Sequence, residues 1–171
     1  MIDDRAFRDA LGRFASGVTV ATTELDGVAH AMTASSFTSV SLVPPQVLLG
    51  VHDINRFHEA VVQSGRWAIS ILNETGESAA SHFAVRGRDL ITQFDSIPHH
   101  RGEHGLILID NALAWLECET VNSVVAGDHT MLIGKVLSAK VNSNPDSPLL
   151  YYRSEYGSIT RLGHGERSDR A

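Results

Sequence analysis

The chain has 171 residues, of which 43% are hydrophobic and 20% charged, and its formal net charge is −6. This composition is typical of a globular domain with a sizeable core and excludes wholesale disorder, while the acidic balance argues against binding to DNA or RNA. The single cysteine, Cys118, excludes an internal disulfide. No apolar stretch approaches the roughly 20 residues of a membrane-spanning helix, and the start lacks a signal-peptide core, so we expect a cytoplasmic protein without membrane contact.

Local patterns in the first half of the chain predict two helices and three strands. Phe7, Leu11 and Phe14 recur at helical spacing and share one face. Asp26-Gly27 is a typical hairpin turn between two runs rich in β-branched residues. The expected elements are a helix at 3–17, strands at 18–25, 28–35 and 46–51, and a helix at 55–65.

The second half of the chain reads mainly as strands. Residues 86–105 are polar and are expected to be irregular. Short strands that turns interrupt regularly favour an antiparallel barrel or sandwich. We expect one domain at 1–160 and a flexible tail at 161–171. The remaining expected elements are strands at 66–72, 112–125, 130–141 and 148–152, and a short helix at 77–85.

Residues 33–41, T-A-S-S-F-T-S-V-S, contain an unusual density of hydroxyl groups just before a double proline. Small hydroxyls and free backbone N–H groups at a strand end can bond a phosphate or the edge of a heterocycle without filling the space the ligand needs. The alternative is a polar strand rim with turns made by Ser and Thr side chains. Composition alone favours the rim.

Other polar residues offer further candidates for binding. His129 follows a Gly-Asp turn between two expected strands, so it lies at a strand mouth and could donate to a ligand; the alternative is an ordinary turn histidine. Arg86 and Arg88 follow the expected short helix, and either guanidinium could hold a phosphate.

Metal binding and nucleophilic catalysis find little support in the sequence. His99, His100, Glu103 and His104 supply ligand types for zinc, but they lie in a loop without a periodic scaffold, and we expect no metal site. Cys118 lies within a strand pattern and is expected in the core. No acid–base pair stands out, so we expect no catalytic residue in the covalent sense.

A series of motifs in a fixed order carries a family resemblance. From about residue 5 to 157 the chain resembles the short-chain flavin reductases, which are the reductase components of two-component flavin monooxygenases. The resemblance implies a mainly β fold, a split β-barrel of Greek-key, FMN-binding type with a few short flanking helices, and a homodimer with the flavin near its interface. The motifs are FRDALGRFASGVTVATT, DGVAHAMTASSFTSVSLVPPQVLL, SGRWAISIL, SAASHFA, LAWLECE, AGDHTMLIGKV and SPLLYY.

The same resemblance implies which residues contact the cofactors. In this family the T-A-S-S stretch runs along the flavin, and the segment after the next strand meets the ribityl phosphate or the AMP half of FAD. The Gly-Asp-His motif lies near NADH or NADPH. The implied contacts are Thr33, Ala34, Ser35 and Ser36 with FMN or FAD, His52 and Asn55 with the phosphate region, Phe83 and Arg86 with the flavin, and His129 and Tyr152 with the nicotinamide dinucleotide.

The implied reaction is hydride transfer from nicotinamide C4 to flavin N5, in which the cofactor carries the chemistry. Reduced flavin would then pass to a partner monooxygenase through a transient encounter. One alternative is a split-barrel protein that binds flavin or heme without turnover. Another is a protein similar to pyridoxamine phosphate oxidases, which requires a basic phosphate-binding cluster, and the sequence alone does not show one.

Overall fold

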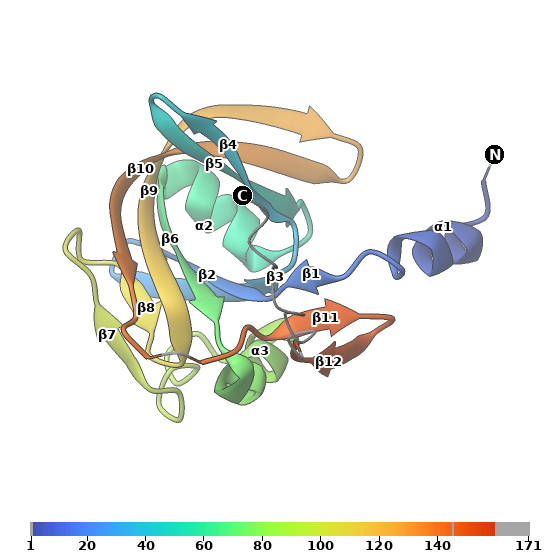
Figure 1. Ribbon diagram of the computed structural model, residues 1–171. Helices are drawn as coiled ribbons and strands as arrows, with labels where there is room; N and C mark the ends of the chain where they lie inside the picture. Colours follow the sequence, from blue (N-terminus) through green and yellow to red (C-terminus); the bar gives the residue numbers. More distant parts are fainter. Residues whose placement is uncertain (1, 145, 160–171) are drawn as a thin grey trace, which may run out of the picture.

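A computed structural model describes residues 2–144 and 146–159 (Figure 1). The fold is mainly β, as predicted. In chain order the elements are α1 (Asp4–Leu11), β1 (Ser16–Gly17), β2 (Thr19–Leu25), β3 (Val28–Ala34), β4 (Phe37–Leu42), β5 (Pro45–His52), α2 (Arg56–Ser64), β6 (Arg66–Leu72), the 3₁₀ turn η1 (Glu74–Gly76), α3 (Glu77–Ala84), β7 (His99–Arg101), β8 (Ile107–Ile109), β9 (Ala112–Ala126), β10 (His129–Val141), β11 (Leu150–Tyr152) and β12 (Glu155–Gly157).

Seven antiparallel strands form the main sheet, in the order β3-β2-β6-β9-β10-β5-β4. β3 and β4 stand at its opposite edges, yet β3 ends at Ala34 and β4 begins at Phe37. That short link spans at most about 11 Å, so the two edges must converge there. The sheet therefore curls into a barrel that is split between β3 and β4, as Figure 1 shows, and the predicted fold class is confirmed.

Two apolar clusters pack on opposite faces of the curled sheet, since the neighbouring residues Val20 and Ala21 of β2 fall in different clusters. In one, Phe57 and Val61 of α2 pack with Trp67 and Leu132 of the sheet. In the other, Phe83 of α3 joins residues of β2, β6, β8 and the loop that follows α3. Helix α2 begins and ends as predicted, because the Asn55 side chain caps its first turn and Gly65 adopts a left-handed conformation at its end. Helices α2 and α3 are thus held against β3 from two sides.

The N-terminal helix is shorter than predicted and does not pack on the body. Asp3 caps its start, and it ends at Leu11 rather than near Gly17. Its predicted apolar face exists, but α1 buries no residue, and Phe14 beyond it is 78% exposed. Figure 1 shows α1 extending away from the barrel. Helical periodicity identifies an apolar face but cannot say whether the same chain covers it.

Two more expectations need correction. No strand was expected between residues 36 and 45, but the chain leaves β3 at Ser35-Ser36, crosses to the opposite edge of the sheet and forms β4 there. Part of the region expected to be irregular forms β7, which pairs with β8. The tail at 161–171 lies outside the described residues. No helix in the described part of the chain is long and apolar enough to cross a membrane.

Candidate functional site

A cavity of about 400 Å³ opens between β3, the start of α2 and the end of α3. This volume lies within the range typical of small-molecule sites. Its walls come from residues 30–33, 54–57 and 83–88, together with Leu90. Four of the predicted cofactor contacts line it: Thr33, Asn55, Phe83 and Arg86. Segments distant in the sequence are therefore brought together around one space.

The cavity wall is basic. Arg56, Arg86 and Arg88 line it together with His30, and none of the lining residues is acidic. Such a wall favours an anionic group such as a phosphate. The sequence analysis found no basic cluster and was wrong on this point, because Arg56 lies at the start of α2 and the other two arginines follow α3. His30 and Met32, which also line the cavity, carried no recognisable signal in the sequence.

Arg88 holds one wall of the cavity in place. Its Nη1 donates to the carbonyl oxygens of Phe83 (2.9 Å) and Val85, and its Nη2 donates to that of Ala31 (2.7 Å). These bonds join the end of α3 to β3. Burial, reinforced by the nearby charge of Arg56, lowers the pKa of Arg88. Arg88 thus acts mainly to hold the wall in place. Arg56 Nη2 donates to the carbonyl of Arg88, so its other N–H groups and the side chain of Arg86 remain to meet a ligand.

Two buried polar atoms of lining residues test whether the cavity fits a flavin. Neither Nδ1 of His30 nor Nε of Arg88 has a hydrogen-bond partner within the described residues. Burial, with a smaller effect of Arg56, lowers the pKa of His30 below its usual 6.5, so its imidazole is neutral near pH 7. Buried polar groups normally find partners. A polar heterocycle with an anionic tail would suit this basic wall, so the residues present fit a flavin.

The hydroxyls of the T-A-S-S stretch are mostly committed to the protein. Thr33 Oγ1 donates to the carbonyl of Ala80 at 2.5 Å, and Ser36 Oγ donates to that of Gly50 at 2.8 Å. Both hydroxyls can therefore only accept a hydrogen bond from a ligand. A Cβ at Gly50 would lie 3.1 Å from that of Ser36, so glycine allows this close approach. Ser35 is exposed. Ala34, Ser35 and Ser36 lie next to the lining residues but are not among them, and their contact with flavin stays a prediction.

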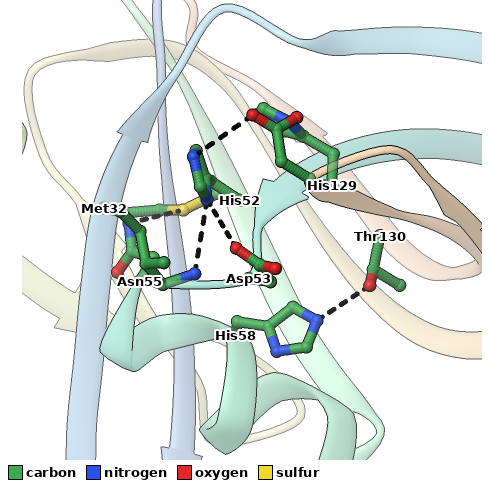
Figure 2. Close-up of polar contacts among 9 residues, drawn as sticks. Met32, His52, Asp53, Asn55, His58, His129 and Thr130 are labelled. Carbon is green, nitrogen blue, oxygen red and sulfur yellow. Dashed lines mark hydrogen bonds and ion pairs between the residues drawn. The ribbon is translucent and has the colours of Figure 1, made fainter.

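A second polar cluster lies where β5 ends and β10 begins (Figure 2). His52 and His129 are cross-strand partners, and their rings are 4.9 Å apart. Asp128 binds His129 Nδ1 at 2.7 Å and lies 3.5 Å from His52 Nε2. The hydrogen bond with His129 is the main cause of the lowered pKa of Asp128, which is therefore ionised at neutral pH. His52 and His129 are not among the cavity-lining residues. Tyr152 lies apart in β11, which forms a separate sheet with β1 and β12.

The other candidates of the sequence analysis have structural contacts. His99 Nδ1 lies 2.7 Å from the carbonyl of Ile97, and His100 pairs with Asp110. Across residues 2–144 and 146–159, no group of three or more His, Cys, Asp or Glu side chains is arranged to hold a metal. Cys118 is buried in the core, as predicted, and burial raises the pKa of its thiol to about 12. A thiol with that pKa does not act as a nucleophile near neutral pH.

Known proteins share both this sequence and this fold. The chain is 39% identical over 137 residues to a probable flavin reductase from Rhizobium meliloti (strain 1021), covering 80% of this chain but 43% of that longer protein. It is 35% identical over 156 residues to the reductase component of 4-nitrophenol 4-monooxygenase/4-nitrocatechol 2-monooxygenase from Rhodococcus opacus, covering 91% of this chain and 81% of the relative.

A solved structure agrees with these relatives. The NADH:FAD oxidoreductase SgcE6 of Streptomyces globisporus C-1027, in complex with NAD and FAD fragments, superposes with a TM-score of 0.85 at 35% identity, over 97% of this chain and 98% of that one. Residues 11–160 match the family described as flavin reductase like domain. The sequence motifs, the split barrel with its basic cavity and these relatives together show that the chain belongs to the flavin reductase family.

Proposed function

We propose that this protein is an NAD(P)H:flavin oxidoreductase that reduces FMN or FAD by direct hydride transfer. The observation that carries the proposal is the cavity, which combines a basic wall, two buried polar atoms without partners and an apolar side formed by Met32, Ile54 and Phe57. When bound, the flavin supplies the hydride acceptor. The family to which the chain belongs and its NADH-dependent relatives agree with this activity.

The side chains of the protein bind and orient rather than react. Arg56 and Arg86 hold the phosphate of the flavin, while Arg88 keeps the end of α3 against β3. Thr33 and the neighbouring Ala34, Ser35 and Ser36 face the ring through small groups, which leaves space for a second planar ring to approach. Asn55 and Phe83 complete the cavity. His129 contacts the nicotinamide dinucleotide from the strand mouth, with Tyr152 as a second contact.

One assay tests the activity directly. The purified protein is mixed with NADH or NADPH and with FMN or FAD, and the absorbance of the reduced nicotinamide is followed in all four combinations. We expect oxidation with at least one pair, faster with NADH, and reduction of the flavin under anaerobic conditions. Flavin binding without oxidation in any combination would support the non-catalytic alternative and contradict the proposal.

We further propose that the reduced flavin serves a partner flavin-dependent monooxygenase in the cytoplasm. The similarity to the reductase component from Rhodococcus opacus supports this role, and the buried, unpaired Cys118 suits a reducing compartment. The transfer needs no stable complex, since reduced flavin can diffuse between the two proteins.

A homodimer would explain the apolar side chains that the chain leaves exposed. Large exposed apolar patches commonly mark protein interfaces. In this protein, exposed apolar side chains occur on β4, on the second half of β9 and on α1; among them Leu42 is 89% and Val125 is 79% exposed. Light scattering should therefore give twice the chain mass, and Val125→Glu should weaken the dimer. Val62→Glu, on the exposed side of α2, is the control. A monomeric wild type would contradict this proposal.

A further inference from the structure

The second polar cluster, formed by His52, Asp53, Asp128 and His129 and called the strand-mouth cluster from here on, is hydrogen-bonded to one wall of the cavity. The backbone N–H of Asp53 donates to the carbonyl of Asp128 at 3.0 Å, which joins the turn after β5 to the turn before β10. On α2, His58 Nε2 lies 2.8 Å from the hydroxyl of Thr130. Residues 54–57 of the same segment line the cavity. The turn that carries His129 is therefore held against the segment that forms the flavin wall.

His52 is the side chain at the centre of this junction (Figure 2). Its Nδ1 lies 2.9 Å from Asp53 Oδ1 and 3.3 Å from the backbone N of Ile54, and its Nε2 faces Asp128 Oδ2 at 3.5 Å. The other oxygen of Asp128 binds His129 Nδ1. The carboxylate of Asp128 thus lies between two imidazoles, hydrogen-bonded to His129 and 3.5 Å from His52, and it belongs to a side chain that is 70% exposed.

The charges around His52 argue against a role in holding phosphate. Asp53 and Asp128 lie on either side of its ring, so a phosphate at this point would meet two carboxylates. The basic wall of Arg56, Arg86 and Arg88 offers the opposite environment. The two halves of the reaction thus have separate electrostatic settings: the anionic tail of the flavin belongs with the arginines, and His52 belongs with His129.

We infer that His52 is a positioning residue for the nicotinamide dinucleotide: it holds Asp128, and through Asp128 it fixes the orientation of His129. An exposed aspartate with a single partner samples several rotamers, and a second partner restricts it. With its Nδ1–H donated to Asp128, a neutral His129 keeps Nε2 free to accept a hydrogen bond, as from the carboxamide of a nicotinamide. The inference rests on the proposed function, because it requires His129 to contact the reductant.

Two conservative variants separate the roles of the two ring nitrogens. Glutamine places its amide nitrogen near the position of Nε2, whereas asparagine places it near that of Nδ1. We expect His52→Asn to raise the KM for NADH about fivefold, as for the loss of one polar contact, with kcat within about twofold and the Kd for flavin unchanged. His52→Gln should recover most of the affinity for NADH. In a His129→Ala background, His52→Asn should have no further effect.

The matched control is His100→Gln. Its amide lies near the position of Nε2, so it removes the Nδ1 contact of another partly exposed His–Asp pair, that of His100 with Asp110, and should leave the KM unchanged. NMR of the imidazole nitrogens gives a readout that is independent of turnover: His129 should show Nδ1–H in the wild type and lose that preference in His52→Asn. A lower flavin affinity with unchanged KM, an additive effect on His129→Ala, or an unaltered His129 tautomer would overturn the inference. Wild-type protein without NADH oxidation would instead overturn the proposed function, and the NMR result would still decide whether His52 orients His129.

Discussion

The cavity wall around Arg88 and the strand-mouth cluster around Asp128 are both polar, but they differ in how far their side chains are buried. Arg88 binds three backbone carbonyls in a half-buried setting and lies over the ring of Phe83, with its guanidinium carbon 5.3 Å from the ring centroid. The side chains of the strand-mouth cluster are instead exposed by 29% to 70%. Buried, charge-assisted hydrogen bonds contribute strongly to stability, whereas exposed ion pairs contribute little. If the proposed assignment holds, the residues that bind flavin are built into the fold, and those that bind the reductant are oriented on its surface.

The largest expected effect on stability comes from removing the side chain of Arg88. Arg88→Ala leaves the carbonyls of Ala31, Phe83 and Val85 without their partner, so we expect it to lower the free energy of unfolding by about 3 kcal/mol. Chemical denaturation measures the change. The matched control is Arg5→Ala, which removes an exposed pair with Asp9 and should cost less than about 0.5 kcal/mol. Equal losses of unfolding free energy in Arg88→Ala and Arg5→Ala would contradict the view that buried bonds hold this wall of the cavity in place.

Arg86 tests the flavin side without disturbing the fold. Its side chain lines the cavity and is exposed, so Arg86→Ala should leave the unfolding free energy nearly unchanged. Loss of one charge-assisted bond should raise the Kd for FMN about tenfold. Riboflavin lacks the phosphate and provides the internal control, because its Kd should stay constant. A similar loss for both ligands would place Arg86 away from the phosphate.

His129 tests the reductant side. His129→Ala should raise the KM for NADH or NADPH about fivefold, since it removes one polar contact, and should change flavin affinity less. Steady-state kinetics and flavin titration measure the two effects on the same preparation. A variant that loses flavin but keeps its KM for the nicotinamide would reverse the assignment of the two regions.

The smallest expected effect is a dependence of stability on pH that originates in the cavity. Because burial lowers the pKa of His30 in the folded protein, the unfolded chain binds the proton more readily. The contribution of His30 is therefore fully present above pH 6.5 and declines as the pH falls below that value. His30→Gln should make the wild-type loss of stability below pH 6.5 less steep, as thermal unfolding at several pH values can show. Parallel curves for both proteins would contradict this assignment.

Local signals in the sequence were sufficient for much of the barrel. Asp26-Gly27 adopts the left-handed backbone that its hairpin requires, and Asn55 and Gly65 bound α2 as predicted. Each of these features depends on residues close in the chain. Strand β4 was missed as a separate element because its hydroxyl-rich sequence reads as a continuation of β3, and only the topology of the sheet shows the crossing.

The site could be predicted only where a family motif marks it. Thr33, Asn55, Phe83 and Arg86, for which the motifs imply cofactor contacts, line one cavity, and the contacts themselves stay a prediction. The role of Arg88 could not be read in this way, because its three carbonyl partners carry no side-chain signal. The pairing of His52 with His129 depends on the register between β5 and β10, which no local pattern encodes.

The crossing at Ser35-Ser36 also affects how the protein avoids aggregation. Strands β3 and β4 are the two edges of the sheet, and unpaired edges invite pairing with other chains. The short link draws these edges toward each other, and the bonds between Ser36 and Gly50 hold it against β5. A chain cut or lengthened at this link would release both edges. Aggregation, rather than the loss of a hydroxyl contact, would then be the first consequence.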